Sequence, residues 1–308
     1  MSWLIYRDKC PECGGELMEP RLFNLLVETH LGPVKDDSSL TYLRGETTQG
    51  IYVNYKNVKT AMAAEIPFGI GQIGKAFRNE ITPGHFIFRM REFEQMEQQY
   101  FVKPADADKY FDFWKKERMN WYVALGVKEK KLRFQPHTKE ELAHYARSAE
   151  DIQYDFPFGW GEIEGVHNRG DWDLSRHSDF SGEDLSEIDD KTGGRFYPHI
   201  IETSAGVARS LLVFLIDAYD DSDKERFVLK IDPRLAPYKV AVFPLLANKP
   251  DLVEKARSIF KDLKMTSLNV AWDDRGNIGK RYYSQDEIGT PWCVTIDHQT
   301  LEAPSAGG

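Results

Sequence analysis

Apolar and polar positions alternate along two long segments, which predicts a β-hairpin in the first third of the chain. The first segment covers residues 68–77 and the second covers residues 86–102. Pro83 and Gly84 stand between them, and this dipeptide is typical of a turn. The second arm carries unusually many charges for a half-buried strand, which makes it a candidate for a functional surface.

Helical periodicity follows the hairpin. Between residues 105 and 125, Tyr110, Trp114, Trp121 and Leu125 recur at steps of four and seven, which predicts a helix with one apolar face. The basic stretch 103–133 is then interpreted as the solvated side of this region. The later patterns predict a helix over 140–152, a strand over 158–163, polar loops through the acidic run 183–190, a strand over 197–202 and an apolar helix over 206–219.

The pattern of apolar and polar residues changes after Pro233 and Pro237. The pattern then predicts strands over 239–246, 268–272 and 292–296, separated by helices over 250–263 and 277–287. This βαβαβ order implies a small parallel sheet covered by helices. We therefore place a domain boundary near residue 236, which gives a first domain over 1–235 and a second over 236–308.

Composition and charge narrow the class of protein. Of 308 residues, 41% are apolar and 29% are charged, which is typical of a globular protein. No apolar stretch approaches the roughly 20 residues of a membrane span, and no apolar signal segment opens the chain. Three cysteines are too few for a disulfide framework. The net charge of −9 argues against a protein that coats nucleic acid. We expect a soluble, cytoplasmic protein with no membrane and no DNA partner.

The charged arm of the hairpin has a face of mixed chemistry. At strand period, Arg89, Arg91, Phe93, Gln95 and Glu97 lie on one side. A row of guanidiniums, a ring, an amide and a carboxylate suits a ligand with a phosphate, a flat base and an ammonium. A solvated sheet face with cross-strand ion pairs carries the same charges, so charge alone leaves both interpretations open.

A second polar segment joins a strand to a helix. Glu202 and Ser204 stand at the strand end, and Arg209 lies in the first turn of the helix that begins near Gly206. Helix N-termini favour anions, and an arginine adds a bidentate phosphate donor. Taken alone, a tight turn with a surface arginine is the simpler interpretation.

Together the two segments resemble signature motifs of the class II aminoacyl-tRNA synthetases. Residues 77–80 and 88–93 are similar to the second motif of that family, and residues 206–209 are similar to its third. More narrowly, stretches similar to homodimeric glycyl-tRNA synthetases are residues 44–50, 91–97, 142–145, 161–165, 202–206 and 276–280. The resemblance implies an α+β catalytic domain, an antiparallel sheet flanked by helices, followed by a small α/β anticodon-binding domain.

The resemblance also implies roles for the matching positions. Arg78 would hold the ATP α-phosphate and the amino-acid carboxylate, Glu80 the adenine amino group, and Arg209 the outer phosphates. These three are the implied catalytic residues. The rest of the implied ATP site is Asn79, Phe88, Arg89, Met90, Arg91, Glu92, Phe93, Glu162, Ile163, Gly206, Val207 and Ala208. Within it, Phe93 would stack on adenine and Glu162 would contact the nucleotide through Mg²⁺. The implied glycine pocket is Glu46, Phe93, Glu94, Gln95, Met96, Glu97, Glu202, Thr203, Ser204, Ala205 and Gly206.

The activity implied by the resemblance is ATP-dependent activation of glycine and its transfer to tRNA(Gly) by a homodimer. Adenylation needs in-line positioning and charge neutralisation, and no protein general base. A pocket crowded by carboxylates and a hydroxyl excludes larger side chains by clash, so no editing site is needed. The competing interpretation is a non-catalytic accessory protein that binds tRNA or another nucleic acid on the same fold.

Features at the two ends of the chain are less specific. Cys10 and Cys13 have the spacing of half a zinc ribbon, but tetrahedral zinc needs a second pair of ligands, so two reduced thiols on a surface knuckle are the alternative. In the implied anticodon domain, residues 280–283 suit contacts with RNA. Compared with the family, the chain lacks an N-terminal region with the dimer-forming motif and the end of the anticodon domain, so we expect a partial chain.

Overall fold

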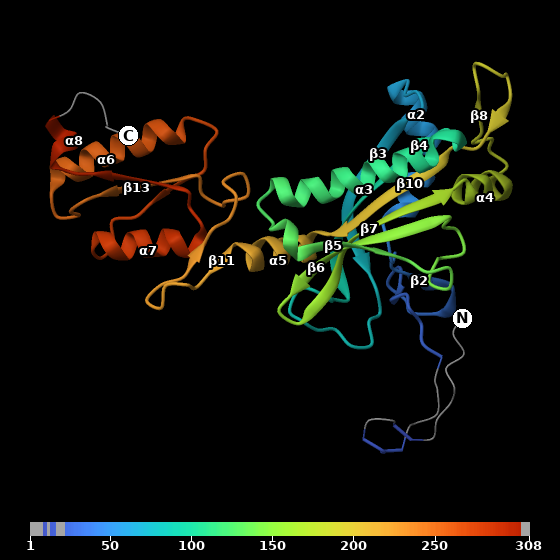
Figure 1. Ribbon diagram of the computed structural model, residues 1–308, viewed down its shortest axis with the longest axis horizontal. Coiled ribbons are helices and arrows are strands. Elements are labelled where there is room, and N and C mark those ends of the chain that lie inside the picture. Colours follow the sequence, from blue (N-terminus) through green and yellow to red (C-terminus); the bar gives the residue numbers. More distant parts are fainter. Residues whose placement is uncertain (1–8, 11–12, 17–21, 303–308) are drawn as a thin grey trace.

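A six-stranded antiparallel sheet organises the first part of the molecule (Figure 1). The computed structural model describes residues 9–10, 13–16 and 22–302. The strand order is β3-β4-β10-β7-β6-β5, and every neighbouring pair is antiparallel. The strands are β3 (Phe68–Phe77), β4 (Glu92–Val102), β5 (Leu132–Pro136), β6 (Ser148–Phe156), β7 (Gly159–Gly170) and β10 (His199–Gly206). The predicted α+β class is confirmed.

Helices cover the sheet on both faces. Helix α3 (Ala107–Ala124) packs on one face against β7 and β10. On the opposite face, α1 (Thr48–Tyr52), α2 (Tyr55–Met62) and α4 (Trp172–Ser181) cover the ends of β4 and β10. Because successive strand residues point to opposite faces, Ile200 of β10 packs under α1 and α4 while Ile201 packs under α3. The face that carries Ile200 is called the α1 face. Helices α1, α2 and α4 cover only part of it, and the candidate site lies on the rest.

Helix α5 (Val207–Ala218) continues directly from β10. Its Val213 and Phe214 enter a core with Tyr122 of α3 and with residues of β5, β6 and β7. The other short elements of this part are β1 (Glu28–His30), η1 (Asp37–Ser39), β2 (Leu40–Tyr42), η2 (Pro104–Asp106), η3 (Glu129–Lys131), β8 (Glu187–Ile188), β9 (Arg195–Phe196), β11 (Tyr219–Asp220) and β12 (Val228–Leu229).

A separate three-stranded parallel sheet follows. Its central strand β13 (Val240–Pro244) lies between β14 (Val270–Trp272) and β15 (Trp292–Ile296). Helices α6 (Pro250–Lys264) and α7 (Ile278–Ile288) separate the strands in the chain, and α8 (His298–Glu302) follows them. The predicted βαβαβ order is confirmed. The predicted division at residue 236 falls between β12 and β13 and stays a prediction.

The second arm of the hairpin is shorter than predicted, because β4 begins at Glu92 rather than at residue 86. Residues 84–89 instead form a turn closed by a bridge between Gly84 and Arg89. In this turn His85 and Phe86 adopt the left-handed conformation, with φ of 53° and 55°. A strand cannot pass through that conformation. Arg89 and Arg91 also lie before the first residue of β4, so strand alternation does not place them on the face of Phe93.

The predicted helix over 140–152 is wrong. Residues 148–156 form strand β6, in which Ile152, Tyr154 and Phe156 are buried. Pairing with β5 and β7 decides this, since neither neighbour is visible in the local pattern. Helix α4 went unpredicted, because Leu174 is the one large apolar side chain that it buries completely.

The basic stretch 103–133 is also less solvated than predicted. Lys115 lies 2.5 Å from Glu150, and Arg118 lies 2.5 Å from Glu164, so α3 is tied to the sheet by ion pairs. Both cations are largely buried side chains. Across the described residues, no helix has the length and apolarity needed to cross a membrane.

Candidate active site

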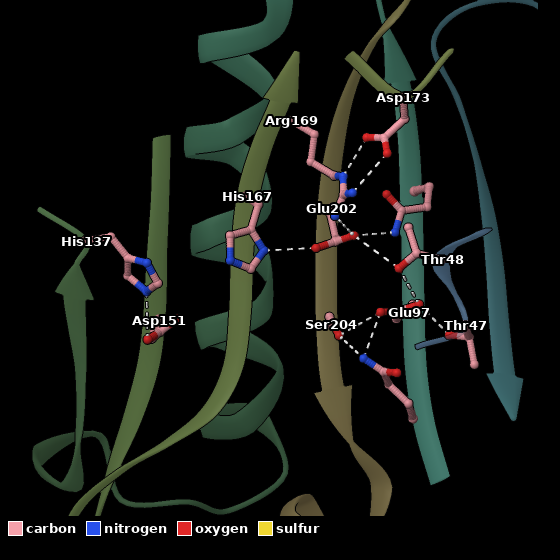
Figure 2. A network of polar contacts seen from close by, with 12 residues as sticks. Thr47, Thr48, Glu97, His137, Asp151, His167, Arg169, Asp173, Glu202 and Ser204 are labelled. Carbon is pink, nitrogen blue, oxygen red and sulfur yellow. Dashed lines mark hydrogen bonds and ion pairs between the residues drawn. The ribbon is translucent and has the colours of Figure 1, made fainter. Parts of the chain in front are cut away.

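A cluster of polar side chains lies on the α1 face of the central strands β4 and β10 (Figure 2). Ser204 is directly opposite Glu97 in the antiparallel ladder, and Glu202 is opposite Gln99. Alternation along each strand therefore gathers these four side chains, with Gln95, on one face. Separate parts of the chain build the cluster, since the hydrogen bond from Gln95 Nε2 to Ser204 Oγ spans 109 positions.

Glu97 is buried among neutral hydrogen-bond donors. Its carboxylate accepts from the hydroxyls of Thr47 and Thr48, from Ser204 Oγ at 3.1 Å and from Gln95 Nε2 at 2.7 Å. No cation of the described residues forms an ion pair with it. Burial, and then the charge of Glu202, raise the pKa of Glu97. The site therefore holds a desolvated carboxylate that lacks a positive partner.

Glu202 has the opposite environment. Its Oε2 lies 3.0 Å from Arg169 Nη1 and accepts from Gln99 Nε2 at 2.7 Å, while its Oε1 lies 3.0 Å from His167 Nδ1. Burial alone would raise the pKa of Glu202, but His167, Arg169 and Gln99 together hold it at about 2. Glu202 is thus a fixed anion.

Arg169 ties this anion to a second one. Its Nε and Nη2 donate to the two carboxylate oxygens of Asp173 at 2.8 Å and 3.0 Å, and its guanidinium stacks 3.8 Å from the ring centroid of Tyr145. Only 2% of the Arg169 side chain is exposed. The buried contacts fix the guanidinium plane that Glu202 meets.

Glu46 completes the acidic cluster just before α1. It is partly buried and makes no hydrogen bond to another described residue. Burial raises the pKa of Glu46, and the charge of Glu202 raises it further, while Arg169 opposes the shift. Glu46 and Glu97 are therefore the two acidic groups of the cluster that form no ion pair with a cation of the described residues.

A cavity of about 120 Å³ adjoins the acidic cluster. Gln95 and Ser204 belong to both, since they line the cavity and also hydrogen-bond to Glu97 of the cluster. The lining is Arg78, Glu80, Ile87, Phe88, Arg89, Met90, Phe93, Gln95, Glu162, Ser204, Ala205, Gly206, Ala208 and Arg209. The structure thus brings together most of the nucleotide positions expected from the sequence, three cationic side chains and two aromatic rings among them.

Packing and hydrogen bonds hold the two main cations of the cavity in place. The Arg209 guanidinium lies 4.3 Å from the ring centroid of Phe88, and its Nη1 donates to the carbonyl of Glu162 at 2.8 Å. Arg78 lies 5.5 Å from the ring centroid of Phe93 and donates through Nε to the carbonyl of Gly45 at 3.1 Å. In both cases the remaining N–H groups are left for a ligand, as an anion-binding site requires.

Gly161 makes room for this arrangement. A Cβ at this position would lie 2.9 Å from Cζ of Phe88 and 3.1 Å from the ring of Phe156. Any larger residue would displace Phe88, and the position of Arg209 depends on the Phe88 ring.

Several expected site residues lie elsewhere. Side chains at even-numbered positions of β4 and at odd-numbered positions of β10 point to the α3 face, so the side chains of Glu94, Met96, Thr203 and Ala205 point away from the cluster, although Ala205 still lines the cavity. Ile163 is 1% exposed and belongs to the apolar core.

Polar contacts engage three further residues outside the cavity lining. Glu92 pairs with Lys75, Arg91 Nε donates to the carbonyl of Glu80 at 3.0 Å, and Asn79 donates to the carbonyl of Asn24 at 3.0 Å. Val207 does not line the cavity.

Other residues of the cluster were not expected from the sequence. These are Thr47, Thr48, Gln99, His167, Arg169 and Asp173. Gln99 was within reach of sequence reasoning, because it continues the spacing of two that joins Gln95 to Glu97. His167 and Arg169 carried no such signal, since their partner Glu202 lies more than 30 positions away.

Two expectations outside the main site change. Arg281, expected to face RNA, is 1% exposed and donates to backbone carbonyls of Pro244, Asp274, Arg275 and Gly276. Cys10 and Cys13 lie in a short knuckle in which Cys10 N donates to the carbonyl of Gly15 at 2.8 Å. Across residues 9–10, 13–16 and 22–302, no group of three or more His, Cys, Asp or Glu side chains is arranged to hold a metal ion, so zinc is not supported.

Comparisons with known proteins agree with this geometry. Residues 33–218 match the family described as tRNA synthetase class II core domain (G, H, P, S and T), and residues 239–306 match the anticodon binding domain. The glycine–tRNA ligase of Treponema denticola is 53% identical over 302 residues, covering 95% of this chain and 66% of the relative. Those of Thermobifida fusca and Bifidobacterium longum are 52% and 51% identical over 306 residues, covering 95% of this chain and 66% and 62% of the relatives.

The chain therefore spans somewhat less than two thirds of the length of these relatives. The core-domain match nevertheless covers more than half of the chain and includes the acidic cluster and the cavity beside it. The resemblance seen in the sequence is confirmed: this chain belongs to the class II tRNA synthetase family.

Proposed function

We propose that the chain is a glycine–tRNA ligase, which activates glycine with ATP and transfers it to tRNA(Gly). The observation that carries this proposal is the pair of partly or fully buried carboxylates without a cation, Glu97 and Glu46, beside a cavity lined by arginines. A buried anion without a partner is costly, and the ammonium of an amino acid supplies the missing charge.

The small size of the amino acid follows from what surrounds Glu97. Thr47, Thr48, Gln95 and Ser204 all hydrogen-bond to its carboxylate and so occupy the space around it. A side chain on the ligand would have to displace one of these groups and leave a buried donor unpaired. Glycine has no side chain, so clash rather than a second editing site excludes its competitors.

The neighbouring cavity suits ATP. Phe93 offers a ring face for the base, and Arg78 and Arg209 place positive charge where the phosphates would lie. A carboxylate oxygen of glycine attacks the α-phosphorus, the bond to the bridging oxygen breaks, and pyrophosphate leaves. The two guanidiniums neutralise the charge that develops, and no side chain needs to remove a proton because the nucleophile is already ionised.

Glu162 fits the Mg²⁺ that class II synthetases use. Its carboxylate is half exposed, lines the cavity and lies 3.6 Å from Arg209 Nη1. Mg²⁺ is commonly bound by one or two carboxylates together with substrate phosphates, so one such group at the phosphate end is an adequate protein contribution. The ion would add positive charge to the phosphates there.

The match of residues 239–306 to the anticodon binding domain supports tRNA as the partner. Tyr283 is exposed on α7 and offers a ring for base stacking. We extend the proposal to a homodimer in the cytoplasm, as the family suggests.

A glycine-dependent ATP–pyrophosphate exchange assay with a panel of amino acids tests the proposal. We expect exchange with glycine and little with alanine or serine. Calorimetric titration with glycine tests the pocket separately from the chemistry. Exchange driven better by another amino acid would contradict glycine specificity. Folded protein that binds neither glycine nor ATP would instead favour the accessory-protein alternative.

A further inference from the structure

Two threonines at the start of α1 have no role in the chemistry proposed so far. Thr47 and Thr48 are both completely buried, and each hydroxyl donates to the same atom, Oε2 of Glu97 (Figure 2). The contact from Thr48 measures 2.9 Å and joins residues 49 positions apart. The start of α1 is thus tied to a carboxylate on the central strand β4.

Thr47 occupies the N-cap position of α1. A threonine oxygen in that position ordinarily accepts a hydrogen bond from a backbone N–H of the first helical turn. The side chain of Thr47 makes no such bond, and its hydroxyl donates to Glu97 instead. The contact with Glu97 is therefore not a by-product of helix capping.

The four donors to Glu97 divide between its two oxygens. Gln95 and Ser204 bond to Oε1, and both also line the cavity. Thr47 and Thr48 bond to Oε2, and neither lines the cavity. A ligand that enters from the cavity therefore approaches the Oε1 side, whereas the threonines hold the carboxylate from the α1 side without touching the ligand.

The charged groups that face Glu97 oppose its ionisation. Glu202 faces it from β10, and Glu46 faces it from the segment before α1. From β3 its partner in the antiparallel ladder is Gln72, which is neutral. The ionised form of Glu97 therefore depends on hydrogen bonds.

The basic side chains near the cluster are engaged with other groups. Arg169 and His167 of β7 both face Glu202, at 3.0 Å in each case. Arg44 and Arg78 donate through Nε to backbone carbonyls. These contacts leave the ammonium of a ligand as the cation that can reach the buried carboxylate of Glu97.

We propose that Thr47 and Thr48 are positioning residues of the amino-acid pocket, whose hydroxyls hold Glu97 as the ionised acceptor of the ligand's ammonium. An ionised carboxylate attracts an ammonium, whereas a protonated carboxyl would first have to release its proton. The inference rests on the proposed function, because the ligand whose ammonium meets Glu97 is taken to be glycine.

The balance of forces on Glu97 supports this role. Burial is the first cause that raises its pKa and the charge of Glu202 is the second, while the hydrogen bonds from Thr47 and Thr48 lower it. Without one of these hydroxyls, Glu97 would take up a proton at a higher pH. Glycine binding would then weaken as the pH falls and recover as the pH rises.

Valine and serine variants separate the hydroxyl from the shape of the side chain. Thr48→Val keeps the branched shape and removes the donor, whereas Thr48→Ser keeps the donor. By calorimetry at pH 6, we expect glycine to bind about tenfold more weakly to Thr48→Val and within about threefold of the unaltered chain to Thr48→Ser. The loss in Thr48→Val should be smaller at pH 8. Valine and serine at position 47 should behave in the same way.

Two controls separate this effect from general damage to the fold. Thr60→Val changes an exposed threonine of α2 and should leave the affinity for glycine unchanged at both pH values. The affinity of every variant for ATP should also stay unchanged, because neither Thr47 nor Thr48 lines the cavity. Thermal unfolding checks that each variant is folded.

Equal weakening by the valine and serine variants, both folded, would overturn the proposal, because the hydroxyl would then not matter. A loss in Thr48→Val that is the same at pH 6 and pH 8 would overturn it too, since Glu97 would keep its charge without the donor. Valine variants that bind glycine as tightly as the unaltered chain would have the same consequence.

A ¹³C NMR titration of the glutamate carboxyl carbons tests the protonation of Glu97 without any ligand. The Glu97 signal is identified by its loss in Glu97→Gln. We expect Glu97 to titrate at a higher pH in Thr48→Val than in the unaltered chain, and an unchanged titration would refute the inference. If the titration moves as expected but another amino acid binds in place of glycine, the glycine proposal fails and the role of the threonines holds for that amino acid.

Discussion

The buried guanidinium of Arg169 gives the sharpest prediction for stability. Replacing it by methionine keeps the length of the side chain and removes the charge. Three N–H···O contacts of 2.8 Å, 3.0 Å and 3.0 Å are lost, and two buried carboxylates, Asp173 and Glu202, lose their shared cation. Glu202 keeps His167 and Gln99, whereas Asp173 keeps no other ion-pair partner among the described residues.

Breaking a buried ion pair from one side costs roughly 3–5 kcal/mol, because the remaining charge is left desolvated. We therefore expect Arg169→Met to lower the free energy of unfolding by about 4 kcal/mol. At roughly 2–4 °C per kcal/mol, the midpoint of thermal unfolding should fall by about 8–16 °C. Adding Asp173→Asn to this variant should recover part of the loss, since it removes one of the two stranded charges.

Urea unfolding followed by circular dichroism measures these differences. Arg176→Met is the matched control, because Arg176 is an exposed arginine of the same helix as Asp173 and should change stability by less than about 0.5 kcal/mol. A loss below about 1 kcal/mol for Arg169→Met would refute the reasoning, because it would mean that the two carboxylates are neutral or hydrated without their partner.

Three further outcomes follow from the site. The pKa of Glu202 is about 2 in the folded protein against an ordinary 4.5, so its ionisation stabilises the fold above pH 4.5 and this contribution is lost as the pH falls toward 2. The free energy of unfolding of Glu202→Gln should therefore depend less on pH between 4.5 and 2. The contribution of Glu97 to stability has the opposite sign, because its pKa is raised in the folded protein and its ionised form opposes folding as the pH rises above the ordinary pKa. Glu97→Gln should therefore unfold at an equal or higher urea concentration at pH 7 while losing glycine binding. A less stable variant that still binds glycine would contradict this. Arg209→Met should raise the KM for ATP about tenfold or more in the exchange assay, and an unchanged KM would remove Arg209 from the phosphate site.

The sequence by itself determined the elements with strong local patterns. The hairpin strand β3, the helices α3 and α5 and the βαβαβ order of the second sheet were all predicted, because their apolar positions repeat within a short window. Local patterns failed where pairing decided the outcome. The local pattern of residues 148–152 predicted a helix, but pairing with β5 and β7 makes this segment part of strand β6. The turn at His85 and Phe86 depends on a left-handed backbone, which the alternation of apolar and polar residues does not reveal.

The candidate site divides along the same line. The motif residues Arg78, Phe93 and Arg209 were placed by resemblance, and the structure brings them to one cavity. Only the tertiary structure showed that Glu202 pairs with Arg169 and His167, while Glu97 and Glu46 form no ion pair within the described part of the chain. That distinction sets which acids are structural and which are available to an ammonium. It arises from contacts between strands far apart in the chain, and the environment of a charge depends on neighbours in space, which the order of residues alone does not give.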